Sequence, residues 1–209
     1  MKNFVWIILF TSFIHCTSKG QEVIDECTVT KISQRAFKKG KEKSKNAFID
    51  TIQIVEKLNS KLVFPLDNSK SFVIKDSLDD LSSDVVIYKS IGFLPSFYSY
   101  LVKVTFLDGE ENWLINKSNG EITKLLRYFY VSPIDSVIVT FDLPEDDNFT
   151  GIKVLKKCKK GIETLCDIHP KKWYPSDGYW MYRNEFILKV IKMDSATIKN
   201  GFYKITINY

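Results

Sequence analysis

The chain has 209 residues, of which 44% are hydrophobic and 26% are charged, and its formal net charge is +5. This length suits a single domain with an ample core, because folded chains of similar size bury about 70% of their unfolded surface. The mild charge argues against a general polyanion-binding or nucleic-acid-binding protein. The glycine-rich phosphate-binding motifs of nucleotide-binding proteins do not occur in the sequence.

Residues 1–20 have the layout of a secretory leader: Lys2 precedes the apolar run Phe4–Ile14, and small polar residues follow. The run is about half as long as a membrane-spanning helix, so we expect a signal peptide rather than an anchor helix. Two processing routes stay open. In one, Cys16 carries a lipid, although bulky residues precede it; in the other, signal peptidase cuts after Gly20. Both routes predict an exported protein, in the periplasm, at the outer membrane or outside the cell.

Residues 21–47 form a basic segment that we expect to be mostly irregular. Between Lys31 and Lys45, its lysines and arginine have Glu42 as their one opposing acid. Gly40 interrupts the helical stretch Val29–Lys45, along which no apolar stripe runs. One interpretation of Lys38–Lys45 is contact with anionic lipid headgroups, to which each basic residue contributes about 1 kcal/mol. The other, which we favour, is a solvated connector.

Residues 48–209 are expected to form a single all-β domain, an antiparallel meander of short strands. In Tyr98–Leu107, apolar and aromatic residues alternate with polar ones, as in a strand with one buried face. Tyr203–Tyr209 repeats this alternation, and shorter runs rich in β-branched and aromatic residues predict further strands. The shorter runs are Ile52–Val55, Lys61–Phe64, Phe72–Lys75, Val85–Tyr88, Asn112–Asn116, Tyr128–Val131, Val137–Phe141, Ile152–Leu155 and Phe186–Ile191.

Turn dipeptides separate these strands. Asp108-Gly109 and Asn119-Gly120 accept positive φ and close tight hairpins, and they bracket the strand that contains Trp113. Residues 98–126 are therefore predicted to form a three-stranded antiparallel meander. Strands that recur about every 8–14 residues suit a propeller, a barrel or a sandwich. Aromatic clusters recur about every 30–45 residues, close to one four-stranded blade, which favours a propeller-like fold over the β-sandwich alternative.

Several segments carry a resemblance to a known group of proteins. These segments are Leu114–Thr123, Tyr130–Asp135, Gly151–Val154 and Trp173–Trp180. They resemble uncharacterised exported bacterial proteins with propeller-like β-repeats, in which a Ser-Pro-Asp-Gly turn opens each unit. The resemblance covers roughly residues 84–193 and departs at that turn, where Ile134-Asp135 replaces Asp-Gly. It implies a small propeller of about four blades and brings no known activity.

Three cysteines follow the leader: Cys27, Cys158 and Cys166. An exported protein meets an oxidising compartment, so a disulfide is expected to form. Because the turn Lys159-Lys160-Gly161 separates Cys158 from Cys166, we take Cys158–Cys166 as the candidate disulfide. This pairing needs a looser loop than a two-residue hairpin. Cys27 is then buried or free.

The sequence contains no recognisable catalytic or metal-binding set. His169 is the one histidine beyond the leader, and it lies three residues from Cys166 with nothing to mark a third partner. No zinc motif occurs, and the acidic stretch Asp142–Asp147 lacks the ligand spacing of a calcium loop. Neighbouring carboxylates such as Glu110-Glu111 point to opposite faces of a strand. We assign no catalytic or metal site and expect no cofactor.

Aromatic residues are the remaining indication of function. Tyr179–Tyr182 and Phe93–Phe97 could present rings that bind sugars or partner proteins, although such rings also pack one sheet on the next. We therefore expect a non-enzymatic exported binding module, or an envelope-associated one, with an unidentified protein or glycan partner. Two alternatives stay open. One is a hydrolase that uses carboxylates brought together by the fold; the other is a membrane-surface module that acts through Lys38–Lys45.

Overall fold

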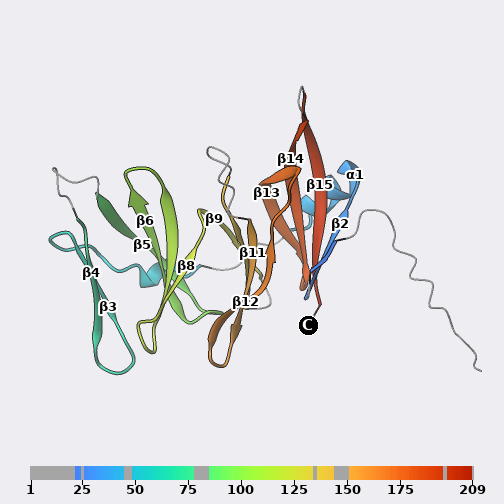
Figure 1. Ribbon diagram of the computed structural model, residues 1–209. Helices are drawn as coiled ribbons and strands as arrows, with labels where there is room; N and C mark the ends of the chain where they lie inside the picture. Colours follow the sequence, from blue (N-terminus) through green and yellow to red (C-terminus); the bar gives the residue numbers. More distant parts are fainter. Residues whose placement is uncertain are drawn as a thin grey trace, which may run out of the picture.

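The computed structural model describes residues 22–24, 26–44, 49–77, 85–133, 136–143, 151–194 and 197–208. The leader with Cys16 lies outside the described residues, as do Lys45 and the turn Ile134-Asp135. The described residues form four antiparallel β-sheets, one α-helix and one short 3-10 helix (Figure 1). The predicted all-β class is confirmed.

Three of the sheets are built from strands that follow one another in the chain. The hairpin sheet contains β3 (Lys61–Pro65) and β4 (Ser71–Lys75). The β5–β8 sheet contains β5 (Val86–Leu94), β6 (Ser99–Phe106), β7 (Glu110–Asn116) and β8 (Ile122–Leu125). The β9–β12 sheet contains β9 (Tyr128–Val131), β10 (Val137–Phe141), β11 (Ile152–Cys158) and β12 (Gly161–Ile168).

The fourth sheet, here called the terminal sheet, combines the two ends of the described chain. Its strand order is β1–β2–β15–β14–β13, so that the early strand β2 pairs with the last strand β15. Its strands are β1 (Glu22–Ile24), β2 (Cys27–Lys31), β13 (Trp173–Tyr182), β14 (Glu185–Asp194) and β15 (Thr197–Ile207).

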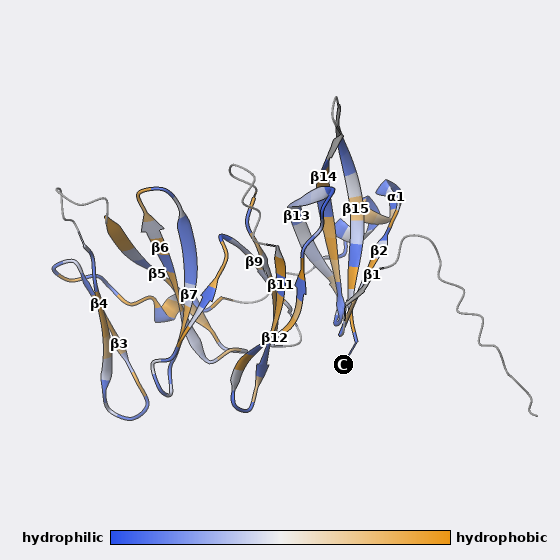
Figure 2. Ribbon diagram, in the orientation of Figure 1, coloured by the Kyte–Doolittle hydropathy of each residue, from blue (hydrophilic) through white to orange (hydrophobic). Residues whose placement is uncertain are grey.

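The four sheets lie in a row, and each packs face to face on the next (Figure 1). Three clusters of buried residues fill the three interfaces between neighbouring sheets. In Figure 2 stretches of hydrophobic colour lie on strands such as β3, β5 and β14, whereas the lower turns are mostly coloured as hydrophilic. Within the described residues the row closes into neither a barrel nor a ring, and it has four layers where a sandwich has two.

Strand β10 illustrates how an interior sheet is encoded. All of its residues are buried, with Phe141 facing the terminal sheet and Ile138 facing the β5–β8 sheet. Its one polar side chain, Thr140, accepts from the Leu126 N–H at 2.9 Å and donates to the Tyr128 carbonyl at 3.0 Å. A run of strand length that is apolar except for Thr140 therefore becomes a strand that is covered on both faces.

Most predicted strands match the observed ones, and residues 98–126 form the predicted meander in β6, β7 and β8. The prediction of a strand at Ile52–Val55 is wrong, because the 3-10 helix η1 (Thr51–Gln53) begins there. The Asp50 carboxylate accepts from the Ile52 N–H at 2.9 Å and caps this helix. The cap outweighs the strand propensity of the β-branched residues that follow it.

The prediction that residues 21–47 are mostly irregular is also wrong. They contain β1, β2 and the helix α1 (Gln34–Lys41), which covers the outer face of the terminal sheet (Figure 1). Ser33 caps the helix, since its hydroxyl accepts from the Ala36 N–H at 3.2 Å. The segment therefore belongs to the same folded body as the strands after residue 48.

Gly40 lies within α1 and contacts Tyr179 of the terminal sheet, whereas the sequence indicates that it interrupts the helix. A Cβ atom at Gly40 would lie 2.4 Å from the Tyr179 hydroxyl, so only glycine lets the helix approach this closely. The same hydroxyl donates to the Phe37 carbonyl at 2.6 Å, and the Phe37 ring packs between Tyr179 and Phe202. One aromatic residue and one glycine thus hold the helix on the sheet.

A disulfide joins Cys27 of β2 to Cys166 of β12, with their Cα atoms 6.2 Å apart. The predicted pairing of Cys158 with Cys166 is wrong. Cys158 lies opposite Gly161 beside a two-residue turn, whereas Cys166 lies opposite Val154, farther along the same hairpin. The tight turn thus separates the two cysteines, and Cys158 carries a free thiol.

Candidate binding site at the hairpin edge

The described residues contain no assembled catalytic set. Cys166 is held in the disulfide and cannot act as a nucleophile. His169 Nε2 lies 2.9 Å from Asp167 Oδ1, but the two side chains are 60% and 42% exposed and contact no nucleophile among the described residues. No group of His, Cys, Asp or Glu in this part of the chain could hold a metal ion. The acidic stretch that begins at Asp142 continues into residues outside the described part.

The neighbouring carboxylates Glu110 and Glu111 serve as partners of basic side chains. Glu110 binds Lys103 and accepts from Arg127 Nε at 3.2 Å, and the bonded Lys103 ammonium lowers the pKa of the Glu110 carboxyl. Glu111 pairs with Lys124 at 3.3 Å. Because the two residues open β7 as neighbours, they face opposite sides of the sheet and do not act on one bond.

A pocket of about 280 Å³ lies between the β5–β8 sheet and the β9–β12 sheet, where their hairpin turns meet. Three turns border it: residues 95–98, 117–120 and 159–160. The β7–β8 and β11–β12 turns are at the lower edge of the molecule in Figure 1. We call this cavity the hairpin-edge pocket. Its lining includes Tyr98, Asn116, Ser118, Asn119, Lys157 and Lys160.

Asparagine side chains shape the wall that the β7–β8 turn contributes. Asn116 Oδ1 accepts from the Ser118 N–H at 2.8 Å, and Asn119 Oδ1 accepts from the Glu121 N–H at 3.0 Å. Gly120, with a φ of 78°, completes the turn. Side-chain bonds of this kind to the backbone two residues on are what makes asparagine a turn residue. The wall is therefore rigid and carries amide and hydroxyl groups.

Tyr98 is the strained residue of the pocket. Its φ of 52° is rare for a residue with a large side chain, and such strain clusters at functional sites. The Tyr98 hydroxyl donates to Asp67 at 3.1 Å, which raises the pKa of the phenol. The ring packs edge-on against Phe93 and is 37% exposed. The alternation in the sequence predicts Tyr98 in a strand, whereas the residue lies in the turn before β6.

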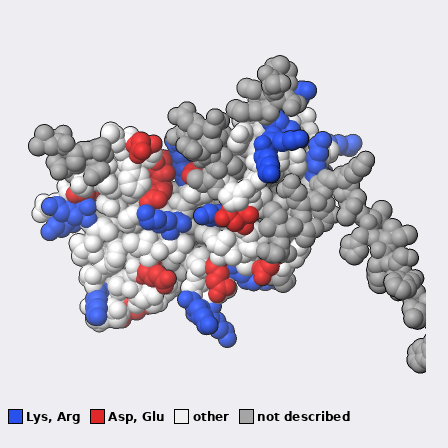
Figure 3. Space-filling view, viewed as in Figure 1, with Lys and Arg blue, Asp and Glu red and all other residues white. Residues whose placement is uncertain are grey.

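Lysines surround Tyr98. The Lys117 and Lys157 ammonium groups lie 5.8 Å and 5.9 Å from the Tyr98 ring centroid, within the range of a cation–π contact. Lys157 Nζ also donates to the Ser96 carbonyl at 3.3 Å, and its burial lowers the pKa of the amine. Lys159 and Lys160 form the exposed β11–β12 turn. Figure 3 shows basic side chains that project beyond the tip of this hairpin.

The free thiol of Cys158 lies at the rim of the pocket. It donates to Glu163 Oε2 at 3.3 Å, and this bond raises the pKa of the thiol. A thiol that stays protonated is a poor nucleophile. Cys158 therefore lines the pocket with a thiol whose bond to Glu163 disfavours the thiolate form.

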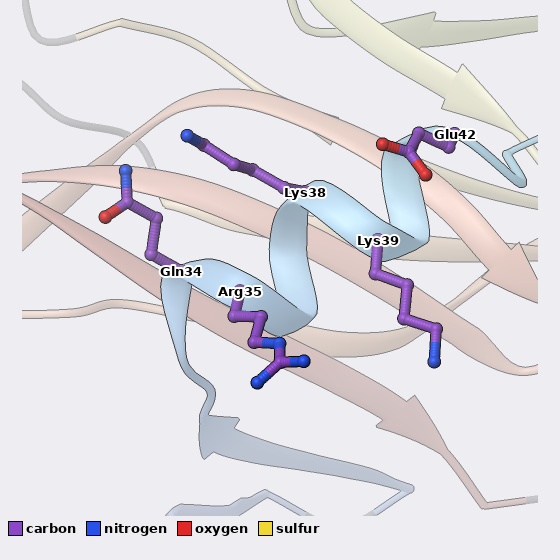
Figure 4. A pocket seen from close by; sticks show the side chains of 5 residues that line it. All are labelled: Gln34, Arg35, Lys38, Lys39 and Glu42. Carbon is purple, nitrogen blue, oxygen red and sulfur yellow. The ribbon is translucent and has the colours of Figure 1, made fainter.

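A second hollow, of about 380 Å³, lies over the outward side of α1 (Figure 4). It is lined by Gln34, Arg35, Lys38, Lys39 and Glu42. Figure 4 shows these side chains spread over the helix in front of the terminal sheet. Lys41 does not line this hollow but forms an ion pair with Asp177 of β13 at 2.8 Å. The helix thus presents a basic, non-aromatic surface opposite Phe37.

The aromatic segments that could bind a partner are mostly packed inside. Tyr179 and Trp180 are buried in the terminal sheet, and Phe93 and Phe97 are buried in the β5–β8 sheet. Tyr182, at 60% exposure, lies at the surface. Most rings in these two segments therefore pack in the core and are not available to bind a partner.

None of the helices in the described part of the chain is long and apolar enough to cross a membrane. Comparison of the chain with protein-family models, with curated proteins and with solved structures gives no match. The resemblance to exported propeller-like proteins therefore stays a prediction.

Proposed function

We propose that this protein is an exported binding module of propeller-like architecture without catalytic activity, and that it binds its ligand in the hairpin-edge pocket. Two features support the architecture and the compartment. The β5–β8 and β9–β12 sheets are four-stranded antiparallel meanders, the unit from which propeller blades are made. The Cys27–Cys166 disulfide is compatible with export to an oxidising compartment.

The observation that carries the binding role is the construction of the hairpin-edge pocket. Three turns from two sheets converge there on a tyrosine held in a rare backbone conformation. Ligand sites are commonly placed on loops that a rigid scaffold positions, and here the scaffold is a row of packed sheets. The pocket has one carboxylate among its described lining residues, Glu121, and the hollow over α1 has one, Glu42. This favours binding over hydrolysis, which uses a carboxylate pair.

Chemical-shift mapping tests the site. We expect the ¹⁵N-labelled protein, titrated with maltotriose, trigalacturonate, a chondroitin sulfate tetrasaccharide and an N-acetylated triglutamate amide, to show saturable shifts with at least one probe. The shifts should centre on residues 95–98, 116–121 and 157–162, since these line the pocket. Shifts that map to other surfaces, or none with any probe at millimolar concentration, would contradict the proposed function.

A second candidate function, action at a membrane surface through Lys38–Lys45, is favoured by the geometry of α1. Arg35, Lys38 and Lys39 all line the outward hollow, while Phe37 faces the sheet. The helix would therefore lie on anionic headgroups without unfolding from the body. This function does not exclude ligand binding, because the two surfaces involve different residues.

Vesicle binding tests the second function. With vesicles of phosphatidylcholine and phosphatidylglycerol at low salt, the double variant K38A/K39A should bind roughly thirtyfold more weakly than the unmodified protein, because each lysine contributes about 1 kcal/mol. The variant K159A/K160A removes the same charge from another surface and serves as the control. Equal losses in the two variants, or binding that ignores salt, would rule out a specific role for α1.

A further inference from the structure

The lysines in and beside the hairpin-edge pocket lack the carboxylate partner that several other lysines of this protein have. Lys57, Lys103 and Lys204 each form an ion pair with a carboxylate. Within the described parts of the chain, Lys117, Lys157, Lys159 and Lys160 form none. Lys157 carries the argument, since within the described ranges its partly buried ammonium contacts the Ser96 carbonyl and the Tyr98 ring and pairs with no carboxylate. A partly desolvated cation of this kind is best satisfied by an anion.

Tyr98 fixes the positions of two of these cations. Its ring lies within cation–π range of both Lys117 and Lys157, and the ring itself is held by Asp67 and Phe93. Two like charges near one ring repel each other in the empty pocket, and an anion between or beside them relieves this repulsion. Because the groups are already placed, little ordering is needed when a ligand binds.

The rest of the lining indicates what carries the anionic group. Asn116, Ser118 and Asn119 offer amide and hydroxyl groups beside the lysines, which match the hydroxyl groups of a sugar. The large apolar side chain Phe97 is buried beneath the turn, leaving no deep apolar slot for a side-chain anchor. A peptide that extended a sheet would need an open strand edge, whereas turns border this pocket.

We propose that the hairpin-edge pocket recognises an acidic saccharide, whose carboxylate or sulfate group binds Lys157 while its hydroxyl groups contact the Asn116–Asn119 wall. This inference rests on the proposed function of the pocket as a binding site and names the ligand class for it. Lys117, Lys159 and Lys160 add positive charge around the group, and Tyr98 orients the lysines without binding the anion itself.

Calorimetric titration with the four probes used for mapping tests the ligand class. Trigalacturonate supplies carboxylates, the chondroitin sulfate tetrasaccharide adds sulfates, maltotriose is neutral, and the triglutamate amide carries carboxylates on a peptide. We expect an acidic saccharide to bind at least about tenfold more tightly than maltotriose and triglutamate, because one hydrogen bond to a charged group accounts for that ratio. The preferred acidic saccharide identifies the anionic group. High salt should weaken this binding.

Lysine variants separate the ligand class from the site. We expect K157Q to weaken binding of the acidic saccharide by about tenfold or more, with K159A/K160A showing a smaller loss. The control K38A/K39A should bind as the unmodified protein does. Should maltotriose or triglutamate bind as tightly as the acidic saccharides, should no saccharide bind, or should K157Q leave the affinity unchanged, the acidic-saccharide inference is overturned. The proposed function survives the first and third outcomes if the shifts still map to the pocket.

Discussion

Replacing Cys27 and Cys166 together by alanine should lower the free energy of unfolding by about 2–5 kcal/mol. The disulfide links residues 139 positions apart in the chain, so it closes a long loop and restricts the unfolded ensemble strongly. It also ties β2 of the terminal sheet to β12 of the neighbouring sheet within one buried cluster. Without it, β2 is held by its pairing with β1 and β15 and by packing alone.

Urea unfolding followed by circular dichroism measures this loss as a lower midpoint, with a steeper slope because the unfolded chain exposes more surface without the cross-link. The variant C158A is the matched control, because it also removes a cysteine sulfur but breaks no cross-link. Its midpoint should stay close to that of the unmodified protein. A similar loss in C158A, or an unchanged midpoint in C27A/C166A, would show that the cross-link does not determine stability.

Local patterns predicted most strands because their signals lie within a few residues. Val137–Phe141 is apolar except for Thr140 and becomes β10 with the same bounds. Asn119-Gly120 supplies the positive φ that the β7–β8 turn requires. Where a cap competes with strand propensity, as Asp50 does before Ile52, the hydrogen bond decides the local structure and the pattern misleads.

Long-range pairing was beyond local patterns. Cys158 and Cys166 are close in sequence, but antiparallel register and a two-residue turn place them apart. The true partner of Cys166 lies on β2, which enters the terminal sheet only through its pairing with β15. The pairing of β2 with β15 also explains why the prediction of an irregular segment at residues 21–47 is wrong. The strand β2 gains its structure from a strand at the other end of the chain. No pattern within the segment signals that contact.

The hairpin-edge pocket could be predicted only in part. The Lys159-Lys160-Gly161 turn is visible in the sequence, and so is the Asn-Gly turn after Ser118. These turns meet because the β5–β8 sheet packs on the β9–β12 sheet. The periodicity of the sequence does not predict this packing. The alternation of residues predicts Tyr98 on a strand face, because a positive φ leaves no mark on that alternation. The pocket therefore becomes visible only in the tertiary structure.

The stacked architecture predicts a second large effect, at Phe141. Its ring is fully buried between the β9–β12 sheet and the terminal sheet, and it stacks on Tyr128 and Tyr130 at centroid distances of 5.8 Å and 5.7 Å. The variant F141A should therefore lose about 3–5 kcal/mol of unfolding free energy, since the strand is enclosed and the cavity cannot collapse easily.

The hairpin sheet, at the end of the row of sheets, offers a control position for the F141A prediction. Val63 lies on β3 in the hairpin sheet and is 47% exposed, because no further sheet of the described chain covers that face. The variant V63A should cost less than about 1 kcal/mol, as substitutions at partly solvated positions usually do. Urea midpoints of F141A and V63A measure the difference directly. Equal losses would mean that the interior sheet is no more tightly enclosed than the end of the row, and the stacked core would have to be reconsidered.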